Sequence, residues 1–181
     1  GDDFCVGICA RLESCKGHDV FLRAAKQAVG RMPNRRFRFL VIGDGSRRAE
    51  LERMTAQSGL SEAVRFTGFV PDVAPLYRLM RLHVNASRGT ETSCLAVSEA
   101  MSAGVPELVS DYGGNREMIG ESLAGIVFPE GNAGALADAI CRVAGNGKLE
   151  DSMRRAAVLR YRRLFTAERM TDRLMAVYRG M

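Results

Sequence analysis

The chain contains no tryptophan, only two histidines and no long apolar run. A membrane-spanning helix needs about 20 consecutive apolar residues, a length that no segment here approaches. The N-terminus also lacks the basic stretch and apolar core of a signal peptide. His18 and His83 stand without metal-ligating partners at useful spacing, so we expect no metal site and place both histidines at the surface or at a helix start.

The five cysteines are odd in number, scattered and without a CxxC pair. This pattern excludes a disulfide framework and a structural zinc site, and it favours a reducing cytoplasm. Cys5 and Cys9 fall in one expected strand on the same face, and we predict that both are small core residues. The chain enters this strand almost directly, without an initiating Met, which suggests a piece of a longer protein.

The formal net charge of +5 favours an anionic partner, such as nucleic acid, a phospholipid surface or a phosphorylated small molecule. Arginine is frequent in the C-terminal third, but aromatic side chains are not interleaved with it in the way that base stacking requires. We therefore interpret this region as a solvated helix face and expect no nucleic-acid partner. The expected location is cytoplasmic, with peripheral attachment to the inner face of a membrane left open.

Apolar, β-branched runs alternate with segments of helical periodicity, which is typical of a parallel sheet covered by helices on both faces. The expected strands are 4–9, 37–42, 64–69, 82–86, 107–110 and 124–128. The expected helices are 18–30, 46–58, 72–80, 93–103, 114–119, 132–144, 148–164 and 166–179. We predict an α/β protein with a Rossmann-like parallel sheet and a C-terminal helical extension, in one domain over residues 1–181.

Ligands of such sheets bind at the loops that follow the carboxyl ends of the strands, where helix N-termini expose unpaired N–H groups. The first of these loops, ARLESCKG, carries Arg11 and Lys16. These cations can converge on one diphosphate, Arg11 as a forked donor and Lys16 as a point charge. Two solvated cations beside a turn at Gly17 are the alternative interpretation.

The second loop, VIGDGSRR, is similar to a dinucleotide-binding fingerprint, but Arg48 stands where the third glycine is required. A tight strand-to-helix turn explains the stretch, with Gly43 and Gly45 relieving the backbone and Ser46 capping the helix.

The third loop, within VRFTGFVPD, exposes backbone beside Phe69 and Val70 and offers a slot for a flat base. A simple strand-to-helix connection is the alternative interpretation, ended by Pro71 and capped by Asp72.

The fourth loop leads into ETSCLAVSE, where Glu91 and Glu99 flank a short apolar segment. If a helix begins near Thr92 or Ser93, its unsatisfied N–H groups and its dipole favour an anion such as pyrophosphate. Glu99 then lies roughly 9 Å along the helix, and the two carboxylates can accept hydroxyls on either side of a diphosphate. The alternative is that Glu91 is a favourable charge at the helix start and Glu99 an exposed mid-helix acid.

Taken in order, four stretches resemble the C-terminal half of family-four, group-one retaining glycosyltransferases of GT-B architecture: ARLESCKG, VIGDGSRRAELE, VRFTGFVPDVAPLY and ETSCLAVSEAMSAGVPELVSDYGGNREMI. The resemblance covers nearly the whole chain, and the E-x7-E element followed by EAMSAGVP is its most specific part. It implies a donor-binding domain for a nucleotide-diphosphate sugar, whose hexose passes to an acceptor hydroxyl with retention. The family needs no metal, so no cofactor is expected.

By position, the resemblance also implies roles for single residues. Arg11 and Lys16 would hold the donor diphosphate, Glu91 would contact the hexose as the catalytic residue, and Glu99 would bind the ribose diol. The backbone at the helix start would meet phosphate, and the third loop would lie near the base. The implied donor-binding residues are Arg11, Lys16, Phe69, Val70, Ser93, Cys94, Leu95 and Glu99.

The resemblance further implies two partners. One is a separate N-terminal acceptor domain, which this sequence does not contain. The other is the acceptor molecule, for which a membrane-surface or lipid-linked molecule is one option. Base and sugar identity stay open. So does an alternative function, a nucleotide- or RNA-binding α/β module without transferase activity. Another GT-B chemistry, such as an epimerase or a phosphorylase, would need a different order of motifs.

The sequence departs from the family at several positions. Thr92 and Cys94 stand where glycines are usual, so the backbone there approaches phosphate less freely, and Ser46 stands where proline is frequent. Glu107 stands where a buried valine or isoleucine is usual. Because a buried, unpaired carboxylate is costly, Glu107 must find a cation, a hydroxyl or the open cleft.

Overall fold

The structure is a computed structural model that describes residues 3–89 and 94–180. Two of the predicted site residues, Glu91 and Ser93, lie outside the described residues.

All six predicted strands are present, and their ends differ from the predicted ones by at most one residue. They are β1 (Phe4–Cys9), β2 (Phe37–Ile42), β3 (Val64–Gly68), β4 (Leu82–Asn85), β5 (Glu107–Ser110) and β6 (Gly125–Phe128). They form one sheet in the order β3-β2-β1-β4-β5-β6, and neighbouring strands pair in parallel. The predicted Rossmann-like α/β class is therefore confirmed.

The predicted helices are present as well. In addition, a short 3-10 turn, η1 (Ser14–Lys16), lies between β1 and α1. The helices are α1 (His18–Arg31), α2 (Arg48–Gln57), α3 (Ala74–Leu79), α4 (Leu95–Ser102), α5 (Asn115–Ile119), α6 (Ala133–Ala144), α7 (Gly147–Leu164) and α8 (Ala167–Gly180). The predicted cap at Ser46 is wrong, because Arg47 is the N-cap of α2 and the Ser46 hydroxyl instead donates to Glu13, 3.0 Å away.

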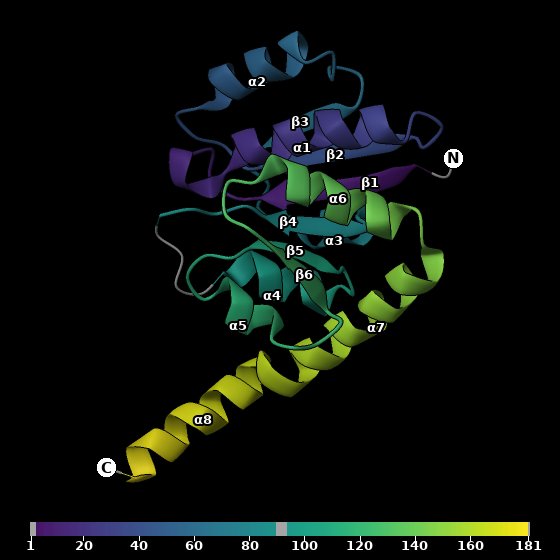
Figure 1. Ribbon diagram of the computed structural model, residues 1–181. Coiled ribbons are helices and arrows are strands. Elements are labelled where there is room, and N and C mark those ends of the chain that lie inside the picture. The colour runs from purple at the N-terminus through teal and green to yellow at the C-terminus, as the bar shows by residue number, and fades with distance from the viewer. Residues whose placement is uncertain (1–2, 90–93, 181) are drawn as a thin grey trace.

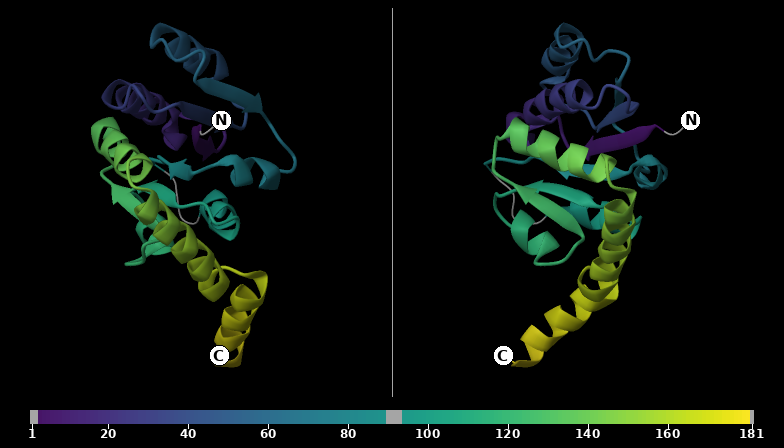
Figure 2. Two further views of the ribbon diagram at one scale, coloured as in Figure 1. Left: turned by 90° about the vertical axis from the view of Figure 1, so that its right-hand side faces the viewer. Right: turned by 45° about the vertical axis from the view of Figure 1, so that its right-hand side comes forward.

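The helices cover both faces of the sheet (Figures 1 and 2). On one face, α1 and α6 pack side by side over the buried side chains Phe4, Val6 and Ile8 of β1. On the other face, α3 and α4 enclose a second group of buried side chains that includes Cys5 and Ile42. Cys5 is buried as predicted, whereas Cys9 at the end of β1 is half-buried.

The chain ends in the predicted helical extension. Figure 1 shows α8 leading away from the sheet, and none of its residues is buried. Its arginines fit the predicted solvated face, but Arg160 on α7 does not, because its guanidinium donates to the carbonyls of Glu117 and Met118 at the end of α5. Within the described ranges, no helix combines the length and the apolar character needed to cross a bilayer.

A bidentate ion pair anchors the start of α7 against the sheet. Arg81, just before β4, donates to both carboxylate oxygens of Glu150, with Nη2 2.7 Å from Oε2. The Glu150 side chain is only 3% exposed, whereas that of Arg81 is 35% exposed. Arg154 lies 4.0 Å from the same carboxylate. Arg81 is thus the cation whose two hydrogen bonds offset the burial of Glu150.

We predict that Arg81→Met lowers the free energy of unfolding by about 1–3 kcal/mol, because the Glu150 carboxylate would stay buried without its paired donors. The partial exposure of Arg81 keeps this loss below that of a fully buried pair. Arg154→Met is the matched control, with an expected loss of about 0.5 kcal/mol or less. Urea denaturation of the two variants measures both values, and equal losses would contradict the assignment.

Candidate functional site

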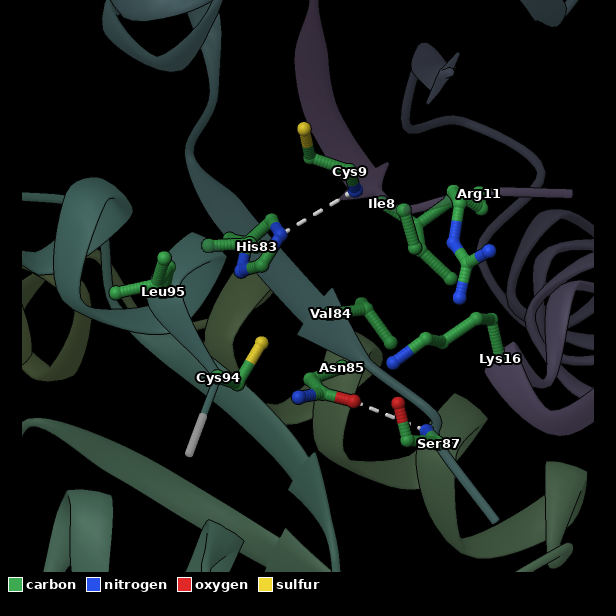
Figure 3. Close-up of a pocket in the computed structure, with 12 residues that line it drawn as sticks. Ile8, Cys9, Arg11, Lys16, His83, Val84, Asn85, Ser87, Cys94 and Leu95 are labelled. Atoms are coloured by element: carbon green, nitrogen blue, oxygen red, sulfur yellow. Dashed lines mark hydrogen bonds between the residues drawn. The ribbon is translucent and has the colours of Figure 1, made fainter. Parts of the chain in front are cut away.

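Two cavities open at the carboxyl ends of the strands. The first, which we call the β1–β4 cavity, has a volume of about 260 Å³ and lies where β1 and β4 separate. Its lining includes Arg11, Lys16, His83, Asn85, Cys94 and Leu95 (Figure 3). The second, the α3–α4 cavity, has a volume of about 440 Å³ and is lined by Pro71, Tyr77, Arg78 and Glu99, among others.

Arg11 and Lys16 come together as predicted, since both line the β1–β4 cavity. In Figure 3 both side chains lie on the same side of the cavity, with the Lys16 nitrogen beside Val84. Arg11 follows the end of β1, and Lys16 ends the turn η1. The cavity therefore has two cations on one wall, an arrangement that suits an anion with more than one charged oxygen.

The turn that carries Lys16 is pressed closely against β4. Gly17 follows it with a φ of +69°, and a Cβ added there would lie 2.0 Å from the carbonyl oxygen of Ala86. A side chain at this position would push η1 away from the strand and move Lys16 out of the cavity wall. Glycine at position 17 is thus required by close backbone approach, which the sequence did not reveal.

The loop GDGS braces the Arg11 segment and does not line either cavity. Leu12 N–H donates to the carbonyl of Asp44 at 3.0 Å, and Arg47 N–H donates to the carbonyl of Leu12 at 3.1 Å. Gly43 has a φ of +127°, and a Cβ there would lie 2.1 Å from the Ala10 carbonyl oxygen. The prediction of a tight structural turn in place of a dinucleotide fingerprint agrees with this geometry.

Arg88 ties the loop after β4 to the opposite wall. Its N–H donates to the carbonyl of Cys15 at 2.7 Å, and its Nε donates to the carbonyl of Ser14 at 3.1 Å. Its Nη2 lies 2.9 Å from Asp19, a buried carboxylate near the start of α1. The pKa of Asp19 is lowered because Arg88 and Arg23 outweigh the effect of burial. One guanidinium therefore fixes the distance between η1 and the β4–α4 loop.

Helix α4 begins later than predicted. Its N-cap is Cys94, without a side-chain capping bond, and Leu95 is its first residue. The N–H groups in the first turn of a helix have no acceptor within the helix. Cys94, Leu95 and Ala96 all line the β1–β4 cavity. Figure 3 shows Cys94 and Leu95 on the side opposite Arg11 and Lys16. An anion in this space would meet positive charge from both sides.

Glu99 lies one helical turn further along α4, in the α3–α4 cavity. Its side chain is exposed, and its Oε2 accepts a hydrogen bond from the Tyr77 hydroxyl at 3.1 Å. Tyr77 on α3 is 1% exposed, and burial, with Cys9 and Glu99 adding to it, raises the pKa of its hydroxyl. A buried, neutral donor thus orients an exposed carboxylate. This role of Tyr77 is not predictable from the sequence, because an apolar helix face gives no sign of where a hydroxyl points.

Phe69 and Val70 do not line either cavity. Phe69 is 77% exposed, and Val70 packs against the group of buried side chains under α3. The residues of that loop that line the α3–α4 cavity are the next ones along the chain, Pro71 and Asp72. Asp72 accepts a hydrogen bond from Ala74 N–H at 3.1 Å, but the N-cap of α3 is Val73, so the predicted cap at Asp72 is wrong by one residue.

Both histidines are buried, so the expectation of surface positions is wrong. His18 does stand at the start of α1, but its side chain is 0% exposed, and burial lowers its pKa to about 4. His83 lies within β4, where its Nδ1 is 2.8 Å from Oε2 of Glu107 on the neighbouring strand. Glu107 is fully buried, and the partner of its carboxylate proves to be the His83 imidazole.

A buried polar network holds the end of β4, and none of its contacts is predicted from the sequence. Asn85 Nδ2 donates to Asn115 at 3.1 Å, and Asn115 Nδ2 donates to the Ser110 hydroxyl at 3.1 Å. The Ser110 hydroxyl in turn donates to the Ser87 carbonyl at 2.6 Å. Polar residues inside the buried stretch LHVNAS were the available signal, because buried polar groups must be hydrogen-bonded.

Among the residues that the structure describes, no group of His, Cys, Asp and Glu side chains has the arrangement needed to hold a metal ion.

Comparisons with known proteins identify the family of the chain. The family described as glycosyl transferases group 1 matches residues 3–146. Alpha-D-kanosaminyltransferase of Streptomyces kanamyceticus is 28% identical over 171 residues, which are 93% of this chain and 44% of that protein. The 2-deoxystreptamine glucosyltransferase of the same organism is 32% identical over 142 residues, 76% of this chain and 35% of that protein. The chain thus spans less than half the length of these relatives.

Solved structures share the fold. HepE of Anabaena in complex with UDP superposes with a TM-score of 0.90 at 21% identity, over 99% of this chain and 50% of that one. The same protein with UDP-glucose gives a TM-score of 0.89 at 22% identity over the same shares. The C-terminal domain of LpcC from Francisella tularensis, a group 1 glycosyl transferase, gives a TM-score of 0.81 at 24% identity, over 91% of this chain and 87% of that one. The chain therefore belongs to the group 1 glycosyl transferases and has the Rossmann-like fold of the C-terminal half of a GT-B enzyme.

Proposed function

We propose that this chain is the donor-binding half of a glycosyltransferase, and that it binds a nucleotide-diphosphate sugar across the β1–β4 and α3–α4 cavities. The hexose passes to an acceptor hydroxyl with retention at the anomeric carbon, and the acceptor is held by a further domain. The whole-enzyme part of this proposal rests on relatives that are more than twice as long as the matched segment.

The observation that carries the proposal is the position of α4 between the two cavities. Its first residues, Cys94 and Leu95, line the β1–β4 cavity, and Glu99 lines the α3–α4 cavity. Leu95 and Glu99 are roughly 6 Å apart along the helix axis at 1.5 Å per residue. That spacing suits a nucleoside diphosphate whose phosphates meet the helix start and whose ribose diol meets the carboxylate one turn later.

Each wall of the site then has a separate task. Arg11 and Lys16 balance the charge of the diphosphate from one side, and the N–H groups at the start of α4 do so from the other. As the glycosidic bond breaks, negative charge grows on the leaving diphosphate, and these fixed positive groups stabilise that charge most at the transition state. Glu99, held by the Tyr77 hydroxyl, accepts the ribose hydroxyls.

Glu91 is assigned to the hexose in this proposal. A carboxylate there would accept sugar hydroxyls and fix the orientation of the anomeric carbon. HepE, a structural neighbour, has been solved with UDP and with UDP-glucose, which supports a nucleotide sugar as the ligand class. No metal takes part, because the cations and the helix start supply the charge.

An RNA-binding module without transferase activity is the competing function, favoured by the net charge of +5. A panel of UDP, GDP, ADP and their sugar conjugates in a thermal-shift assay separates the two. We expect one nucleotide family to raise the melting temperature. We also expect the 181 residues by themselves to transfer no sugar, because the proposed acceptor-holding domain lies outside them. Salt-dependent RNA binding without stabilisation by any nucleotide would favour the RNA module. Sugar transfer by the 181 residues alone would contradict the proposal that donor and acceptor are bound by separate domains.

Arg11→Ala and Lys16→Ala should each weaken nucleoside-diphosphate binding by about tenfold to hundredfold, since a hydrogen bond to a charged group contributes about 1.5–3 kcal/mol. Nucleoside binding should change little, because the cations act on phosphate. Lys26→Ala, on the exposed side of α1, is the control and should leave both ligands unaffected. Calorimetric titrations that show equal losses for nucleoside and nucleotide would remove Arg11 and Lys16 from the site.

Glu99→Gln should weaken a nucleotide and its sugar conjugate alike, by about tenfold to hundredfold, because both ligands carry the ribose diol. Tyr77→Phe should reduce binding of both ligands less, since it only loosens the carboxylate. Glu91→Gln should spare the nucleotide, weaken the sugar conjugate and slow turnover of the full-length enzyme. Identical binding profiles for Glu91→Gln and Glu99→Gln would refute the separate roles.

A further inference from the structure

One row of the sheet beneath the β1–β4 cavity has an unusual composition. Gly7, His83, Glu107 and Gly125 lie side by side across β1, β4, β5 and β6. Residues in register on parallel strands point to the same face, so the imidazole and the carboxylate are neighbours on the face that α3 and α4 cover. His83 also lines the cavity wall, whereas Glu107 is 0% exposed behind it.

The two glycines leave room that apolar side chains fill. A Cβ added at Gly7 would lie 2.3 Å from Cε of Met80, and one added at Gly125 would lie 2.4 Å from Cδ1 of Ile119. The pair is thus enclosed on both sides by apolar atoms and contacts the cavity only through His83. Such an enclosure makes any net charge on the pair costly.

The hydrogen bonds determine where the protons of the pair lie. The N–H of Cys9 donates to Nε2 of His83 at 3.3 Å, so Nε2 is an acceptor and carries no proton. Nδ1 then carries the proton and donates to Oε2 of Glu107 at 2.8 Å. Oε1 of Glu107 is buried without a hydrogen-bond partner among the described residues. A further proton therefore has one place to bind, which is Oε1.

The bond to Cys9 also replaces strand pairing. β1 and β4 are in register only at Val6 with Leu82 and Gly7 with His83, and beyond these residues the strands separate to form the cavity. The Cys9 N–H, two residues before Arg11, would otherwise lack an acceptor on β4. His83 supplies that acceptor with its side chain and ties the end of β1 in place (Figure 3).

The other titratable groups around the pair come from three directions. Cys9 on β1 and Tyr77 on α3 face the imidazole, the Tyr77 ring edge-on at 5.6 Å between centroids, and burial raises the pKa of both, so they stay neutral near pH 7. Glu99 on α4 is reached through the Tyr77 hydroxyl. Arg11 and Lys16 stand across the cavity. Ile119 of α5 and Gly125 of β6 add no charge.

We propose that His83 and Glu107 are positioning residues of the β1–β4 cavity and that the pair holds one additional proton more tightly when a diphosphate occupies the cavity. This inference rests on the proposed donor site. Without the extra proton the pair carries one negative charge in the wall of an anion site, and with it the pair is neutral. An anion in the cavity therefore favours the protonated pair, by the coupling of charge and proton binding.

The sign of the pH dependence follows from this coupling. Burial, partly offset by His83, raises the pKa of Glu107 from 4.5 to about 7. Since the protonated pair binds the anion better, affinity is highest below this value and falls as the pH rises through it. For a shift of one pKa unit on binding, about 0.4 proton is taken up at pH 7, and affinity falls by about fivefold between pH 6 and pH 8. A pair that only fills space predicts neither effect.

The test is isothermal titration calorimetry of the unmutated chain with UDP-glucose, GDP-mannose and ADP-glucose. These ligands are chosen because both phosphates are esterified and do not titrate near pH 7. Repeating each titration in buffers of different ionisation enthalpy measures the protons taken up. We expect about 0.4 proton at pH 7 and about fivefold weaker binding at pH 8 than at pH 6 for the ligand that binds.

Glu107→Gln keeps an acceptor for the Nδ1 proton but cannot take up a proton itself, so its uptake should vanish and its affinity should be equal at pH 6 and pH 8. Glu130→Gln, at an exposed position, is the matched control and should keep the uptake of the unmutated chain. Binding without proton uptake by the unmutated chain, or uptake that persists in Glu107→Gln, would overturn this inference while leaving the donor site intact. If none of the three sugars binds, the proposed function fails, and this inference fails with it.

Discussion

The separation of β1 from β4 governs the whole site. Strands β2 and β3 extend the sheet on one side of this pair, and β5 and β6 extend it on the other. The chain leaves β1 toward α1 on one face and leaves β4 toward α4 on the opposite face. Two loops that turn away from each other cannot fill the space between them, so a crevice forms at the reversal of strand order. Of the residues proposed to meet phosphate, those that the structure describes (Arg11, Lys16, Cys94 and Leu95) all line this crevice.

A crevice between parallel strands leaves backbone groups unpaired, and this chain satisfies them with side chains. The His83 imidazole accepts the N–H of Cys9, and the network through Asn85, Asn115 and Ser110 holds the residues after β4. Arg88 fixes η1 against the same loop. Where strand pairing ends, these ion pairs and hydrogen bonds join the two walls of the cavity.

The same kind of contact explains how the departure from the family pattern at Glu107 is accommodated beside His83. A lone carboxylate at Glu107 would be buried without compensation, and a lone imidazole at His83 would lack a partner for its Nδ1 proton. In register on adjacent strands, each satisfies the other at 2.8 Å. The glycines at both ends of the row complete the arrangement, because larger side chains would collide with Met80 or Ile119.

Strand and helix positions, the parallel sheet and the meeting of Arg11 with Lys16 could all be predicted from the sequence, because apolar periodicity and the rule for parallel sheets are local in the chain. The burial of both histidines, the partner of Glu107 and the donor to Glu99 could not. These contacts join Tyr77 to Glu99 and His83 to Glu107, residues more than twenty positions apart in the chain. The sequence by itself determined which residues stand at the carboxyl edge of the sheet; only the tertiary structure decided which of them touch, since strand order and register set those distances.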